Sequence, residues 1–195
     1  PYSKEHTERS RARIVEAARI LFNIHGFEKV TIDMVMAKAG LTRGGFYRHF
    51  KSKEALYAAA VKSFLMGRGA VWREEAGIDP SNLAPEMAQH MLDSYLSERH
   101  LEDRENQCPM IALPSDVARG NPDVQGAYQD LLTSMVWLFE TLQPTQDDQA
   151  RQRALAMAAL CVGGMVLARS IPDASLACEL RSSAYEAASQ LNHSS

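Results

Sequence analysis

Apolar residues recur three to four positions apart along most of this chain, which is the spacing of an α-helix, and no segment alternates as a strand does. The first such segment has one apolar face, formed by Ile14, Ala17, Ala18, Leu21 and Phe22. Gly26 follows that face where a helix is expected to end. The pattern predicts an all-α fold of about nine helices: three in an N-terminal head, one linking helix and five in a C-terminal body.

Capping residues set the expected boundaries of these helices. Thr31, Thr42 and Ser52 can each cap a helix that follows directly. The helix after Ser52, at about residues 53–75, connects the head to the body. The body helices are expected at about residues 83–99, 110–119, 123–142, 147–170 and 174–191.

The most informative segment is residues 31–56, which read TIDMVMAKAGLTRGGFYRHFKSKEAL. It contains two short helices joined by a turn at Gly40, with small residues beside the turn that let the helices cross closely. The second short helix places Phe46 and Phe50 on one side, four residues apart, and arginine, tyrosine and histidine on the other. This arrangement is typical of a helix-turn-helix, whose second helix enters the major groove of DNA.

The charge distribution supports a nucleic-acid partner although the net charge is only −3. Residues 1–53 contain 11 lysines and arginines against 5 acidic residues, whereas residues 54–195 contain 10 against 19. A basic head on an acidic body indicates a DNA-binding domain, residues 1–53, followed by a separate domain, residues 54–195.

Residues 9–57 resemble the DNA-binding domain of the TetR family of bacterial transcriptional regulators. The resemblance lies in the segments RIVEAARILFNIHGFEKVTI and MAKAGLTRGGFYRHFKSKEALY, which place Gly-Phe, Ala-Gly, Phe-Tyr-x-His-Phe and Ser-Lys-Glu-x-Leu in order. It implies a dimer that binds a palindromic operator and a small-molecule ligand in its body. The body matches the family only in length and helix pattern, so the resemblance does not identify the ligand.

Eight residues of the head are candidates for DNA contact. Thr31, Thr42 and Tyr47 carry hydroxyls near helix N-termini or on the exposed face, where they can donate to phosphate. Arginine grips guanine with two hydrogen bonds and glycine admits a close backbone, so the candidates for base contact are Arg43, Gly44 and Arg48. Arg48 alternatively belongs to a solvated face. The family resemblance implies phosphate contacts for His49 and Lys53.

The segment from Ala154 to Arg169 is apolar on all sides, so in a soluble chain it needs cover on every side. The last helix offers small residues and leucines, among them Leu180. We expect these two helices from each of two subunits to form a four-helix dimer interface, with Gly163 and Gly164 allowing close approach. Dimerisation also suits DNA recognition, because two heads read two half-sites. The alternative is an ordinary buried core helix.

The remaining body helices predict a pocket for an apolar ligand, because methionine and aromatic side chains form adaptable walls. Its candidate residues, each also compatible with an ordinary core position, are Met87, Met91, Tyr95, Met110, Met135 and Phe139, together with Leu131 and Trp137.

Three widely spaced cysteines form neither a disulfide framework nor a zinc motif, which indicates a reducing cytoplasm. No apolar run approaches a membrane span and no signal peptide is recognisable. Cys108 lies where a helix N-terminus is expected, a position that lowers a thiol pKa, although Glu105 opposes the effect. Cys108 is therefore a possible redox or electrophile sensor, with an unreactive thiol as the alternative.

These features predict a ligand-responsive DNA-binding transcriptional regulator, released from a palindromic operator by a small apolar or electrophilic molecule. No catalytic set, phosphate-binding loop or metal spacing is recognisable, so we expect no enzyme activity, no cofactor and no metal site. Repression is the favoured mode and activation is an alternative. A helical carrier or enzyme without a DNA-binding role is the competing interpretation.

Overall fold

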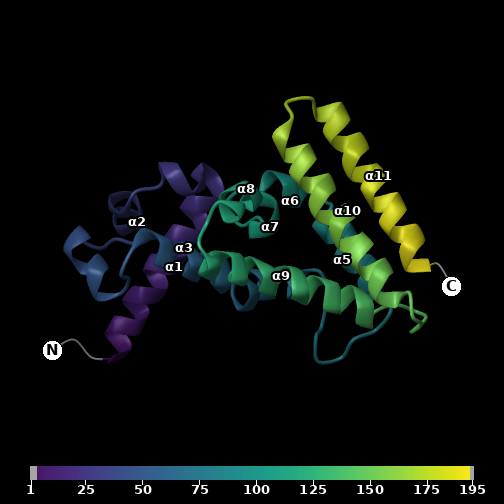
Figure 1. Cartoon of the computed structure of the whole chain (residues 1–195), viewed down its shortest axis with the longest axis horizontal. Helices are drawn as coiled ribbons and strands as arrows, with labels where there is room; N and C mark the ends of the chain where they lie inside the picture. Colours follow the sequence, from purple (N-terminus) through teal and green to yellow (C-terminus); the bar gives the residue numbers. More distant parts are fainter. Residues whose placement is uncertain (1–3, 194–195) are drawn as a thin grey trace.

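The computed structural model describes residues 4–193 and contains eleven α-helices and one 3₁₀-helix, with no strand in that range. Figure 1 shows an N-terminal head at one end of an elongated molecule and a larger helical body at the other. The all-α prediction is confirmed. The helix count exceeds the predicted nine because glycines and prolines divide two of the expected helices and because a further short helix lies in an expected loop.

The head consists of α1 (Lys4–Lys29), α2 (Ile32–Lys38) and the 3₁₀-helix η1 (Arg43–Arg48). The regular part of α1 breaks at Gly26, whose φ of 76° is left-handed, as expected for a glycine that ends a helix. Phe22 and Phe46 are fully buried in the core of the head.

The expected linking helix is two helices, α3 (Lys53–Met66) and α4 (Arg68–Glu75). The break occurs at Gly67, where an added Cβ would lie 2.7 Å from the carbonyl oxygen of Ser63. The start of α3 belongs to the core of the head, because the Tyr57 ring packs edge-on against Phe22 with centroids 4.8 Å apart. The break turns α4 into the body, where it forms part of a cavity wall.

The body comprises seven helices: α5 (Met87–Tyr95), α6 (Glu98–Glu102), α7 (Pro109–Ala112), α8 (Pro114–Ala118), α9 (Pro122–Thr141), α10 (Ala150–Ser170) and α11 (Ala174–His193). The helix expected at residues 83–99 is shorter, and α6 begins within it and extends into an expected loop. The helix expected at residues 110–119 divides before Pro114, because proline disfavours helical geometry in the residue preceding it.

Helices α10 and α11 form an antiparallel pair on the far side of the body from the head (Figure 1). Gly164 permits their close crossing, since an added Cβ there would lie 2.8 Å from the Cβ of Ala184. Gly163 instead faces open space. The outer face of the pair exposes three leucines to about half of their surface, Leu155, Leu167 and Leu176.

Within residues 4–193, α10 is also long and apolar enough to cross a membrane by length and composition, contrary to the expectation from the sequence. Core helices of soluble proteins meet the same criterion, and nearly half of the relevant stretch of α10 is buried inside this subunit. An exposed apolar face on such a helix suits a protein interface.

Candidate DNA-binding surface and ligand cavity

The helix-turn-helix corner is built as its residues predict. Thr31 caps α2, because its side-chain oxygen accepts a hydrogen bond from the amide of Met34 at 3.2 Å. Gly40 takes the left-handed conformation, with a φ of 65°, that turns the chain towards η1. The guanidinium of Arg13 donates to the carbonyl of Ala39, which fastens this turn to α1.

The predicted recognition helix is a single 3₁₀ stretch rather than a regular α-helix. Adjacent Gly44 and Gly45 disfavour helical structure by about 1 kcal/mol each relative to alanine, and short tight helices are common in such segments. Phe46 holds η1 against the core, with no exposed surface, while Tyr47 next to it is 65% exposed. An added Cβ at Gly44 would meet nothing within 4 Å, so the backbone there is open to an approaching ligand.

Six of the eight predicted DNA-contacting residues are exposed on this surface, namely Thr31, Thr42, Arg43, Gly44, Tyr47 and Arg48. Arg43 makes an ion pair with Asp33 at 2.7 Å that must open before the arginine can grip a base. His49 is half-buried, and burial together with the nearby cations of Arg11 and Arg48 lowers its pKa.

Lys53 has an intramolecular role that the sequence analysis did not anticipate. Its ammonium donates to the carbonyls of Phe27 and Val30 at 2.8 and 2.9 Å, and it lies 4.2 Å from the centroid of the Phe27 ring. It therefore ties the loop between α1 and α2 to the start of α3. One N–H remains for the predicted phosphate contact.

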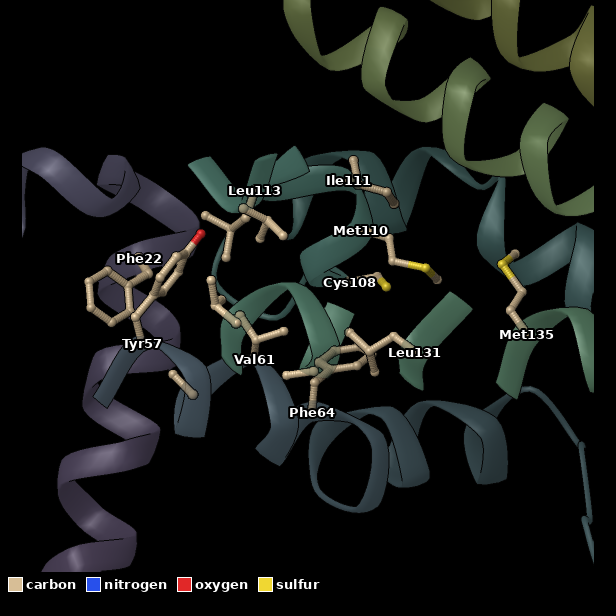
Figure 2. Close-up of a cluster of buried hydrophobic side chains, with 14 of the residues drawn as sticks. Phe22, Tyr57, Val61, Phe64, Cys108, Met110, Ile111, Leu113, Leu131 and Met135 are labelled. Atoms are coloured by element: carbon tan, nitrogen blue, oxygen red, sulfur yellow. The ribbon is translucent and has the colours of Figure 1, made fainter. Parts of the chain in front are cut away.

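The body contains a small apolar cavity of about 50 Å³, partly open to solvent, between α3, α4, α5, α7 and α9. Figure 2 shows four residues of its wall, Phe64, Cys108, Met110 and Leu131, within the cluster of buried side chains. Its wall consists of Phe64, Leu65, Gly69, Trp72, Arg73, Met91, Tyr95, His100, Cys108, Met110, Leu131, Ser134, Met135 and Leu138.

The structure brings together four of the six residues that the sequence predicts for this pocket: Met91, Tyr95, Met110 and Met135. The other two do not line the cavity. Met87 is half-buried against the core, and Phe139 is fully buried. Leu131 is also in the wall, whereas Trp137 is half exposed on the outside.

Helices α3 and α4 also form part of the wall, although the sequence predicts only a linking helix there. They supply Phe64, Leu65, Gly69, Trp72 and Arg73. The available signal was the pair of glycines at positions 67 and 69, which mark a break in that helix.

The inner wall holds two buried polar side chains, His100 and Tyr95, which differ in how their hydrogen-bonding groups are satisfied. The His100 ring contacts the carbonyl of Tyr95 at 2.8 Å through Nδ1 and accepts from the amide of Cys108 at 3.2 Å through Nε2. Burial lowers the pKa of His100, which favours the neutral ring that this pattern requires. The buried hydroxyl of Tyr95 has no hydrogen bond of normal geometry within residues 4–193, and the weakly bonding Cys108 thiol lies beside it.

Cys108 lies at the N-terminus of α7, as expected, but the predicted lowering of its pKa is wrong. The thiol is only 3% exposed, and burial raises its pKa to about 11. Desolvation of the thiolate outweighs the helix terminus, because α7 has only four residues and the apolar wall excludes water. Cys161 is also buried, whereas Cys178 is exposed.

The loop that precedes Cys108 is bonded directly to the head. The side chain of Asn23 in α1 donates to the carbonyl of Gln107 at 2.7 Å, and Arg19 donates to the carbonyl of Glu105 at 2.8 Å. Arg169 of α10 donates to the carbonyl of Asn23 at 2.7 Å. Arg19, Asn23 and Gln107 are almost completely buried, so these bonds form an ordered polar junction between head and body.

A second junction lies at the break in α1. The amide of Phe27 donates to a carboxylate oxygen of Asp116, in α8, at 2.8 Å. An added Cβ at Gly26 would lie 2.9 Å from the same oxygen. Glycine is therefore favoured there both by its backbone conformation and by the closeness of α8.

A basic head with an exposed helix-turn-helix, carried by a helical body with an internal cavity, defines a helix-turn-helix DNA-binding class of protein. Residues 14–60 match the family described as "Bacterial regulatory proteins, tetR family". The N-terminal domain therefore belongs to the TetR family, which confirms the resemblance inferred from the sequence.

Two relatives match about a third of this chain. The Tn10 transposon TetC protein of Escherichia coli is 38% identical over 65 residues, which are 33% of this chain and 33% of that protein. The HTH-type transcriptional repressor Rv1474c of Mycobacterium tuberculosis is 32% identical over 60 residues, 31% of this chain and 32% of that protein. The chain thus spans about a third of the length of each relative.

Solved structures match the whole chain. A TetR-family transcriptional regulator from Cytophaga hutchinsonii has a TM-score of 0.77 at 18% identity, with both chains fully covered. The reduced form of Escherichia coli NemR has a TM-score of 0.73 at 17% identity, covering 93% of this chain and 95% of that one. The complete chain therefore has the fold of these TetR-family transcriptional regulators.

Proposed function

We propose that this protein is a dimeric, ligand-responsive regulator that represses transcription from a palindromic operator in the bacterial cytoplasm and is released by a small apolar molecule. One observation carries the proposal: the wall of the apolar cavity continues, through residues 105–108, into hydrogen bonds with α1 of the DNA-binding head. The name of the mycobacterial relative favours repression.

DNA binding is supported by the exposed face of η1. Tyr47 and Thr42 offer hydroxyls to phosphate oxygens, since the Thr42 side chain makes no capping bond of its own. Arg43 and Arg48 are exposed beside the open backbone of Gly44, in the place of base-reading side chains.

The dimer is supported by the exposed apolar face of α10 and α11. Leu155 and Leu167 lie on α10 and Leu176 on α11, and each leaves about half of its surface uncovered. Gly163 faces outward with open space around it, which suits the close approach of a second α10. Two subunits joined here form a four-helix interface. The dimer then carries two heads, each of which can bind one half-site of the operator.

Ligand response requires a ligand that binds the DNA-competent and released states with different affinity. A molecule that enters the cavity contacts Met110 and Cys108, directly after the loop held by Asn23. Displacement of that loop would alter its bonds to α1 and so the angle of the head.

An electrophile offers a second route through Cys108, because its thiol lines the cavity. The raised pKa makes this route slow at neutral pH. We therefore assign reversible binding as the main route. A carrier or enzyme role finds no support in the described residues.

The test is to select bound fragments from random duplex DNA and to measure affinity for the enriched sequence by fluorescence anisotropy. We expect an inverted repeat, bound by two chains, with log K falling linearly as log salt rises. Enrichment of no sequence, or binding without salt dependence, would contradict the proposal.

A further inference from the structure

One charged side chain stands out in the wall of the cavity. Arg73 lies on the same face of α4 as Gly69 and Trp72, because residues three and four apart share a helix face, and all three line the cavity. Arg73 is half-buried, as are Leu65 and Ser134 in the same wall, whereas the deeper wall around Tyr95 is buried. The guanidinium therefore belongs to the mouth of the cavity.

Arg73 takes part in none of the ion pairs formed by residues 4–193. Its hydrogen bond runs from Nη2 to the carbonyl of Leu65 at 2.9 Å. The neighbouring Arg68 differs, since it pairs with Glu75 at 3.3 Å, and Glu75 also pairs with Arg99.

An unpaired cation at an apolar wall is costly, because part of its hydration is lost without a compensating charge. Burial also lowers the pKa of Arg73, and no acidic side chain of the described residues opposes this effect. A guanidinium presents five N–H donors in a planar fork that matches a carboxylate. Within residues 4–193, this fork makes one hydrogen bond, from Nη2 to the carbonyl of Leu65.

We propose that the ligand of this cavity is an apolar acid, whose carboxylate pairs with Arg73 at the mouth and whose hydrocarbon or aromatic body lies among Met91, Met110 and Met135. This inference rests on the proposed ligand-binding role and names the class of ligand. A ligand oxygen at the inner end would also satisfy the buried hydroxyl of Tyr95, which has no normal hydrogen bond.

A purely structural role is the alternative for Arg73. The carbonyl of Leu65 lies in the last turn of α3, where helix geometry leaves carbonyls without partners, and Arg73 satisfies it. Arg73→Gln separates the two roles, since glutamine retains a donor for Leu65 and removes the charge. Arg99→Gln is the matched control, because Arg99 is largely exposed and outside the cavity wall.

The cavity provides its own optical probe. Trp72 lines it, and the chain contains only two tryptophans. Trp137→Phe removes the exposed one, so the remaining fluorescence reports on the cavity without any DNA present. Octanoate, octanol and octylamine form a matched aliphatic series, and naphthalene-2-carboxylate and naphthalene-2-methanol form an aromatic pair that is measured by calorimetry.

We expect at least one acid to bind about 10-fold more tightly than its alcohol, and octylamine to bind least, because charge-assisted hydrogen bonds are the stronger ones. Arg73→Gln should abolish the preference for acid while the alcohol still binds, and Arg99→Gln should leave it intact. Thermal melting checks that each variant is folded.

Equal binding of acid and alcohol, an acid preference unchanged in Arg73→Gln, or no binding of either acid at millimolar concentration overturns the proposal. Operator release is measured separately on the same samples. Acid binding without release would contradict the regulatory switch and leave the acid site standing, so the two failures are distinguishable.

Discussion

Asn23 is the side chain through which the proposed coupling between cavity and head is best tested. It is 1% exposed, and its amide donates to the carbonyl of Gln107 at 2.7 Å and to that of Glu105 at 3.3 Å. In Asn23→Ala the carbonyl of Glu105 keeps its bond from Arg19. The carbonyl of Gln107 loses its side-chain donor, so the cost is concentrated there.

A buried acceptor left without its partner costs about 1–3 kcal/mol. Asn23→Ala also removes its own buried Oδ1, which has no partner within the described residues, and this offsets part of the loss. We therefore expect Asn23→Ala to lower the free energy of unfolding by about 1–2 kcal/mol. Asn23→Asp should cost more, since a carboxylate would face two carbonyls in a buried site.

The assay is urea unfolding at a fixed protein concentration, because the proposed dimerisation would make apparent stability depend on concentration. Asn82→Ala is the control, since Asn82 is exposed and the hydrogen bond recorded for it, to the carbonyl of Asp79, comes from its backbone amide. The same variants are then tested for operator affinity with and without octanoate. If coupling runs through this junction, Asn23→Ala reduces the ligand-induced change in affinity. If Asn23→Ala is as stable and as responsive to octanoate as Asn82→Ala, the junction does not couple the cavity to the head.

The remaining predictions concern the DNA-binding surface, the dimer interface and the reactivity of Cys108. Arg43→Ala should cost about 1–3 kcal/mol at one operator position, whereas Tyr47→Ala should weaken all sequences alike; equal loss on cognate and random DNA, measured by anisotropy, contradicts the role of Arg43. Leu167→Glu should give monomers in sedimentation velocity, because it buries a charge in the dimer face, and a dimer of unchanged stability contradicts that interface. Iodoacetamide should label Cys178 well before Cys108 at pH 7.5, because a thiol pKa of about 11 leaves little Cys108 thiolate at that pH. Labelling of Cys108, followed by mass spectrometry, should accelerate as the pH rises towards 11, and fast labelling at neutral pH contradicts its burial.

The sequence predicted the head well because its signals are local. A threonine cap, a left-handed glycine and phenylalanines four residues apart act within one or two turns, and the structure confirms them at Thr31, Gly40 and Phe46. The same local signals do not reveal Lys53, whose hydrogen bonds reach residues 23 and 26 positions earlier.

The cavity was predicted in part, because helical spacing identifies buried faces but does not show which of them leave space. Met91 and Met110 are buried and line the cavity, whereas Phe139 is buried and does not. Trp72 was missed because the break at Gly67 redirects α4, and that redirection depends on packing against the body. Burial likewise decides the pKa of Cys108.

The two junctions of α1 limit how freely the head can be exchanged between related proteins. A chimera that joins a foreign head to this body at residue 53 would lose the matching partners of Gln107 and Asp116, which are Asn23 and the Phe27 amide next to Gly26. Such hybrids should retain operator recognition and lose induction unless the donor α1 carries compatible groups at these positions. Under the proposed function, operator specificity would therefore move with η1 into another protein, whereas the response to ligand would depend on the two junctions between α1 and the body.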